Sequence, residues 1–241
     1  MTDRLELFQN DWGYLLLWAT LGIAVATGLV LIVLPAIFGW SGLFTGGTAM
    51  IGTLFYFGGL GAGYIMTEVS LISKLVLALS NATISASILL AGILVFSGLG
   101  SMVSERLLPR VRRAAPLLLL TIVVLLVVYS LWADPVLDAI AGVPYGLRLV
   151  LCLLVVAPPA FCMGFPMPLA MTTLGRLGRD RLFIWAWGIN GCASVIGASA
   201  VPIVSTAFCS SAVLQLSALA YLIAVPAFFA LMGRGAMARA R

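Results

Sequence analysis

The sequence predicts an all-α membrane protein, a polytopic bundle of about seven transmembrane helices. First, 63% of its 241 residues are hydrophobic and only 9% are charged, whereas a soluble domain is about half apolar and about a quarter charged. Second, the hydrophobic residues occur in runs long enough to cross a bilayer. Third, arginines gather in the short connections between these runs, as they do in the cytoplasmic loops of membrane proteins.

A transmembrane helix needs about 20 apolar residues to cross about 30 Å of hydrocarbon. The first run is too long for a signal peptide and lacks a cleavage signature, so we interpret it as a retained helix. No polar block of domain size interrupts the chain, and residues 1–241 are expected to form a single transmembrane domain. The predicted spans lie at about 13–38, 48–73, 83–104, 115–132, 146–173, 183–207 and 211–232.

The arginines predict the orientation. They form three groups that are two spans apart, so all three belong on the side that the positive-inside rule assigns to the cytoplasm. Asp134 and Asp138 fall in a connection that is expected outside. The N-terminus is then outside and the C-terminus cytoplasmic. The groups are Arg106, Arg110, Arg112 and Arg113, then Arg176, Arg179 and Arg181, and finally Arg234, Arg239 and Arg241.

Several function classes are excluded. The net charge of +5 lies in loops and forms no basic, aromatic face for nucleic acid. The chain has no histidine, which removes bis-histidine haem ligation and leaves zinc without a common ligand. We therefore expect no catalytic residue, cofactor or metal. The cysteines form no CxxC pair and are interpreted as small buried hydrophobes: Cys152, Cys162, Cys192 and Cys209.

The second span carries the first candidate site. Gly59 and Gly63 lie four residues apart, a spacing that lets helix backbones approach closely and that could alternatively serve as a hinge. Glu68 is an acid at membrane depth, so it serves either a cation or substrate site or a structural hydrogen bond to another span. Lys74 lies about 9 Å further along and about 240° around the helix. It is expected to extend towards the outer headgroups rather than to pair with Glu68.

The fifth span contains prolines that remove backbone donors, and they predict either a structural kink or a broken helix that lines a cavity. The residues of this predicted break are Pro158, Pro159, Gly164, Pro166 and Pro168.

The sixth span has a narrow surface of small residues that includes Gly191, where we expect close packing against another helix, and Asn190 is its strong polar group. We expect Asn190 to bond to a neighbouring helix, where Glu68 or the carbonyls freed by the prolines would be its partners.

At these segments the chain resembles a known family. The stretches FGGLGAGYIMTEVSLISKLVLALSNATISASILLAGILVFSGLGSMVSERL, FCMGFPMPLAM and WAWGINGCASVIGASA resemble the membrane region of bacterial spermidine synthase-like integral membrane proteins. Those proteins are also described as fused transporter and spermidine synthase proteins. MTDRLELFQNDWGYLLL is similar to the junction between the family's soluble and membrane regions. The resemblance implies a multi-pass protein of the bacterial inner membrane.

The family also carries an aminopropyltransferase-like domain of the Rossmann type. This sequence lacks that domain's glycine loop with its acidic partner about 20 residues on. We therefore expect no enzyme but a non-catalytic membrane subunit that anchors or scaffolds partner proteins in a larger complex. Its expected partners are membrane lipids and other subunits, including a separately encoded soluble or periplasmic domain. The alternative is a transporter or channel for a small cationic solute such as a polyamine, using Glu68 and the broken fifth span.

Overall fold

The structure is a computed structural model that describes residues 2–37 and 47–232. Within those residues all regular structure is helical. The elements are α1 (Thr2–Ile37), α2 (Gly47–Leu79), α3 (Ala82–Ser104), the 3₁₀ helix η2 (Glu105–Arg110), α4 (Val111–Ala141), α5 (Tyr145–Met163), α6 (Pro166–Arg176), α7 (Asp180–Ala207) and α8 (Ser210–Met232).

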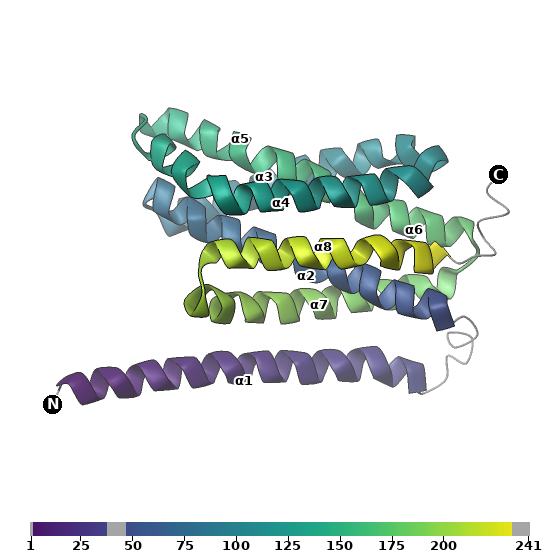
Figure 1. Cartoon of the computed structure of the whole chain (residues 1–241), viewed down its shortest axis with the longest axis horizontal. Coiled ribbons are helices and arrows are strands. Elements are labelled where there is room, and N and C mark those ends of the chain that lie inside the picture. The colour runs from purple at the N-terminus through teal and green to yellow at the C-terminus, as the bar shows by residue number, and fades with distance from the viewer. Residues whose placement is uncertain (1, 38–46, 233–241) are drawn as a thin grey trace.

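The described part of the chain has six stretches that are long and apolar enough to span a membrane. The longest, Ala82–Ala141, contains both α3 and α4, which run in opposite directions on either side of η2 (Figure 1). The protein is therefore an all-α, multi-pass membrane bundle of about seven passes, as the sequence predicts. The six stretches are Trp12–Leu34, Thr48–Leu79, Ala82–Ala141, Tyr145–Arg176, Leu182–Ala207 and Ser210–Met232.

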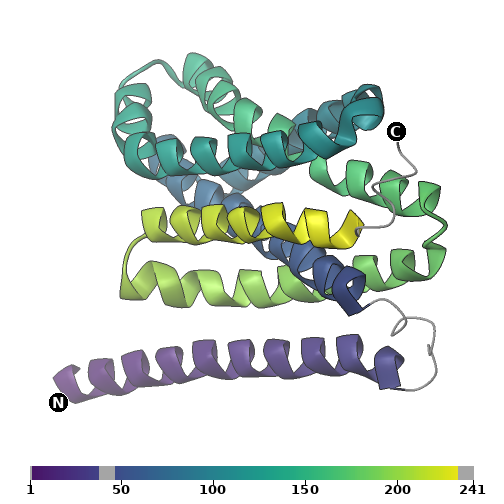
Figure 2. The same ribbon diagram turned by 45° about the vertical axis from the view of Figure 1, so that its right-hand side comes forward.

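Helix α2 is the centre of the bundle. It packs against α7 and α8, while α4 packs on α8 and α5 packs on α3. Figures 1 and 2 both show α1 at the edge of the bundle, beside α7. The start of α1 and the end of α8 lie at opposite ends of the molecule (Figure 1).

Glycines bring α2 and α8 together. A side chain built at Gly59 would lie 2.6 Å from the carbonyl oxygen of Ala220, and one at Gly63 would lie 2.8 Å from the ring of Tyr221. Ser217 fills the same contact, since its hydroxyl donates to the Gly63 carbonyl at 2.6 Å. These contacts confirm the close-packing alternative at Gly59 and Gly63. In lipid, helices gain no hydrophobic free energy from association, so close packing of their backbones stabilises the contact instead.

The predicted break is only partly correct. Helix α5 continues through Pro158 and Pro159 and ends at Met163. The carbonyl of Val155 would normally accept from residue 158 or 159, and neither proline has an N–H. The hydroxyl of Tyr129 on α4 donates to this carbonyl at 2.6 Å. A bond from the neighbouring helix thus replaces one of the two bonds that the prolines remove, and the helix continues through both prolines.

Several predicted boundaries also change. Helix α1 begins at Thr2, and α4 runs to Ala141, so that Asp134 and Asp138 lie in a helix rather than in a connection. The arginine-bearing connection after the third predicted span is helical, as η2 and the start of α4. The C-terminal arginines and residue 38 of the first predicted span lie outside the described residues.

The two internal arginine groups lie at the same end of the bundle, where η2 and the end of α6 are found (Figure 1). Arg179 at this end donates to the carbonyl of Leu231 at 2.6 Å. A guanidinium at the last carbonyls of a helix satisfies an unpaired acceptor and complements the negative end of the helix dipole. The arrangement agrees with the predicted grouping of arginines, while the side of the membrane on which they lie remains a prediction.

Candidate functional site

The interruption between α5 and α6 presses against α3. Helix α5 ends at Met163 and α6 begins at Pro166, and between them the N–H of Gly164 bonds to the Ala160 and Phe161 carbonyls, both at 3.2 Å. A side chain at Gly164 would overlap the backbone of Ser97 on α3. Only glycine lets the two backbones approach so closely.

Beside this break lies a cavity of about 450 Å³, within the range of small-molecule sites. Helices α2, α3, α7 and α8 and the α5–α6 break all contribute to its walls. Most of the lining is apolar. Its polar side chains are Tyr64, Ser97, Ser101, Asn190, Ser194 and Tyr221.

Asn190 forms one wall of the cavity. Its Nδ2 donates to the Phe57 carbonyl on α2 at 3.2 Å. Ser194, one turn along α7, donates to the Gly61 carbonyl at 3.1 Å, and a side chain at Gly61 would overlap the Asn190 carbonyl. Asn190 therefore bonds to a neighbouring helix as predicted, but its partner is Phe57 rather than Glu68 or a carbonyl of the predicted break.

Tyr221 lies opposite on α8. Its side chain is 1% exposed, yet its hydroxyl makes no hydrogen bond with any described residue. No fully enclosed side-chain oxygen or nitrogen in the described residues lacks a partner. The Tyr221 hydroxyl is therefore open to the cavity that the residue lines. Tyr221 could not be singled out from the sequence, because a tyrosine in an apolar run has the pattern of an ordinary core residue.

Glu68 lies one helical turn beyond Tyr64 on α2 and is half-buried. It makes no hydrogen bond or ion pair within the part of the chain that the structure describes. It also does not line the cavity. No hydrogen bond therefore joins Glu68 to Asn190 in the described residues.

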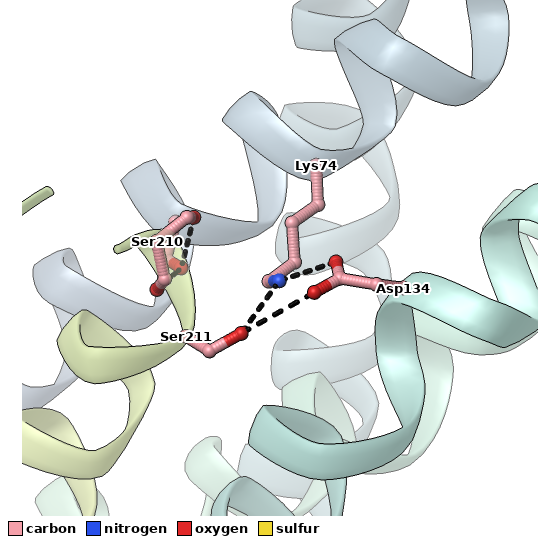
Figure 3. A network of polar contacts seen from close by, with 5 residues as sticks. Lys74, Asp134, Ser210 and Ser211 are labelled. Carbon is pink, nitrogen blue, oxygen red and sulfur yellow. Dashed lines mark hydrogen bonds and ion pairs between the residues drawn. The ribbon is translucent and has the colours of Figure 1, made fainter. Parts of the chain in front are cut away.

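Lys74, the only lysine in the chain, belongs to a separate polar cluster. It is 3% exposed, and its Nζ lies 2.5 Å from Asp134 Oδ1 on α4 and 3.0 Å from Ser211 Oγ on α8 (Figure 3). Ser70 bonds to Ser210 beside it, at 3.0 Å to the carbonyl. The expectation that Lys74 extends to the headgroups is therefore wrong, because three helices enclose it.

The sequence contains signals for three residues of these sites that were not among the predicted site residues. Ser97 and Ser101 are one turn apart and mark a polar stripe on one face of α3. Asp134 falls where the fourth predicted span ends, on the same side as the end of the second span and Lys74. An acidic and a basic residue that lie in different spans at the same depth in the membrane are candidates for an ion pair.

A second hollow region follows the contact between α1 and α7. The two helices meet where Gly28 approaches Cys192 and where Trp185 Nε1 donates to the Ile32 carbonyl at 3.3 Å. Hollows of about 510 and 330 Å³ lie along this contact and share Cys192 as a lining residue. Gly191 lines the larger one, and a Cβ placed on it would have no atom of another helix within 4 Å, so the close approach expected there is absent.

Within the described ranges, no group of three or more histidine, cysteine, aspartate or glutamate residues lies together as a metal site would require. No family model, no curated protein and no solved structure matches the chain. The fold and its apolar spans nevertheless define the protein class: the chain is a multi-pass α-helical membrane protein.

Proposed function

We propose that the protein is a non-catalytic membrane subunit that holds a partner's transmembrane helix in the groove between α1 and α7. The observation that carries this proposal is the isolation of α1. Only 6% of its most apolar window is buried, against 22% to 50% in the other candidate spans. Helix α1 lies at the edge of the bundle in both views and packs on α7 (Figures 1 and 2).

The lining of the α1–α7 groove, which is formed by the two hollows along this contact, supports a helix as its occupant. Gly188 and Gly191 on its α7 wall have open space where a side chain would stand. Small residues let a second helix approach closely, which is the main source of helix association in lipid. Thr20, Thr27 and Ser199 supply hydroxyls further along the same groove.

The test is purification of the full chain from its native membrane in a mild detergent. We expect a partner membrane protein in constant stoichiometry with wild type. Gly191→Leu, which fills the groove, should release that partner, whereas Gly98→Leu should retain it, because Gly98 is equally open but lies on α3. A monodisperse wild-type monomer, or equal retention by both variants, would refute the proposal.

Transport of a small cation is the second candidate, and the unpaired, half-buried Glu68 favours it. The resemblance suggests a polyamine as the first solute to test. Uptake of a labelled polyamine into vesicles should fall strongly in Glu68→Gln and persist in Glu105→Gln, which changes an exposed acid of η2. Equal uptake by Glu68→Gln and wild type would exclude this role for Glu68.

A further inference from the structure

Tyr221 and Asn190, which line the cavity beside the α5–α6 break, each have a polar group that lacks a partner among the described residues. One is the Tyr221 hydroxyl, on a side chain that is 1% exposed. The other is Asn190 Oδ1, because the hydrogen bond of this side chain to Phe57 uses Nδ2. A hydroxyl group complements both, since it can accept from Tyr221 and donate to Asn190 Oδ1.

The charged residues that line a cavity indicate which ligand charge it can stabilise. No aspartate, glutamate, lysine or arginine of the described residues lines the cavity. A charged ligand would lose its water there and meet no counter-charge among the lining residues, which is costly in a membrane interior. The start of α6 also offers an anion little, because Pro166 and Pro168 have no N–H to donate. The lining therefore favours a neutral ligand.

The cavity is accessible from the side of the bundle. Leu94 and Gly98 on α3 form part of its wall and are exposed, Leu94 at 69%. Tyr64 and Tyr221 lie near the middle of α2 and α8, far from both ends of these helices. At that depth the surroundings of a transmembrane bundle are lipid chains, and an apolar molecule can approach from the hydrocarbon.

We propose that this cavity binds the hydroxyl end of a neutral, lipid-soluble molecule that enters sideways from the bilayer, with Tyr221 and Asn190 as its hydrogen-bonding residues. The apolar remainder of the ligand lies past Leu94 and Gly98 towards the lipid. This site is separate from the α1–α7 groove and goes beyond the subunit role, so either proposal can fail without the other.

The experiment uses the full chain in phosphatidylcholine nanodiscs and a dodecanol probe with a photoreactive diazirine next to its hydroxyl. After illumination, mass spectrometry should place the label on peptides that contain Ser97–Ser101 and Tyr221. Tyr221→Phe removes only the hydroxyl and should reduce labelling about two- to tenfold, as expected for one neutral hydrogen bond.

A second variant does not depend on how well the first one folds. Gly98→Leu adds a side chain at the cavity opening, where no atom lies within 4 Å, and should suppress labelling. Gly188→Leu is the matched control, because it is equally open but lines the α1–α7 groove, and its cavity labelling should equal wild type.

Competition tests the chemical class. Unlabelled dodecanol should displace the probe, and dodecane should not. Equal labelling of the cavity by a matched dodecane diazirine would show simple partitioning of apolar molecules and overturn the proposal. Stronger competition by dodecylammonium than by dodecanol would overturn it in favour of a cationic ligand.

Discussion

Lys74 of α2 and Asp134 of α4 form an ion pair across 60 residues of sequence, and Ser211 of α8 bonds to both. The pair is asymmetric: Lys74 is enclosed at 3% exposure, whereas the side chain of Asp134 is 59% exposed. The lysine therefore depends on the aspartate more than the aspartate depends on the lysine.

Removal of Asp134 should destabilise the bundle. Asp134→Ala leaves an enclosed ammonium with Ser211 as its remaining partner, and we expect a loss of about 1–3 kcal/mol. This is less than for a fully buried pair, because the side chain of Asp134 is exposed. Unfolding in mixed micelles with increasing SDS measures the change.

The Lys74→Met/Asp134→Ala double variant is the control, because it removes the charge that was left unpaired. It should recover much of the loss. If the double variant loses the sum of the two single losses, Lys74 and Asp134 are not energetically coupled.

Tyr129 should be coupled to Pro159 through the Val155 carbonyl. Tyr129→Phe removes the donor to that carbonyl and should cost about 1–2 kcal/mol of unfolding free energy. Pro159→Ala restores an N–H at the usual helical position, so Tyr129→Phe should cost little in that background. The same micelle unfolding assay measures both.

Tyr145→Phe serves as the control, because Tyr145 is 45% exposed at the start of α5 and should tolerate the loss of its hydroxyl. If Tyr129→Phe costs the same with alanine at position 159, the hydroxyl does not compensate for the proline.

Gly164 and Gly98 should respond oppositely to the same substitution. A methyl group at Gly164 would overlap the Ser97 backbone, so Gly164→Ala should cost at least about 1–3 kcal/mol, the usual cost of overpacking. Gly98→Ala meets no atom within 4 Å and should stabilise α3 slightly, by up to about 1 kcal/mol. Thermal unfolding of the two variants checks this. Equal melting temperatures would contradict the close contact at Gly164.

The helical runs could be predicted because a segment that crosses the hydrocarbon must be continuously apolar, and the hydrophobicity of each residue is known from the sequence alone. It did not predict how far α1 and α4 extend, because a helix need not end where its apolar residues end. The apolar composition therefore indicates where a span enters the membrane, but it does not indicate the residue at which the helix ends.

The contacts of the candidate site were less accessible to sequence reasoning. Pro158 and Pro159 suggested a break, but the helix continues, and Tyr129 on another helix bonds to the carbonyl that Pro159 leaves without a donor. Lys74 suggested an exposed ammonium, but its burial depended on Asp134 and Ser211. In both cases the outcome depended on a helix distant in sequence, which a single span does not reveal.

The orientation of the bundle can be tested at Cys209. This cysteine is exposed at the turn between α7 and α8, at the end opposite to the arginine groups (Figure 1), so its interpretation as a buried hydrophobe is wrong. If those arginines are cytoplasmic, Cys209 faces outward and a membrane-impermeant maleimide should label it in spheroplasts. Cys209→Ser should abolish the signal, because Cys152 is buried and Cys162 and Cys192 lie partly buried within spans.

A cysteine at the other end of the bundle would report on the opposite side of the membrane. Gly175 is exposed near the end of α6, beside Arg176, and has open space for a side chain. Gly175→Cys in a Cys209→Ser background should react only after the membrane is permeabilised. Labelling of this cysteine in sealed spheroplasts, together with no labelling of Cys209 in the wild-type chain, would show that the bundle has the opposite orientation. The positive-inside rule would then fail for this chain, because the arginines at η2 and the end of α6 would lie outside.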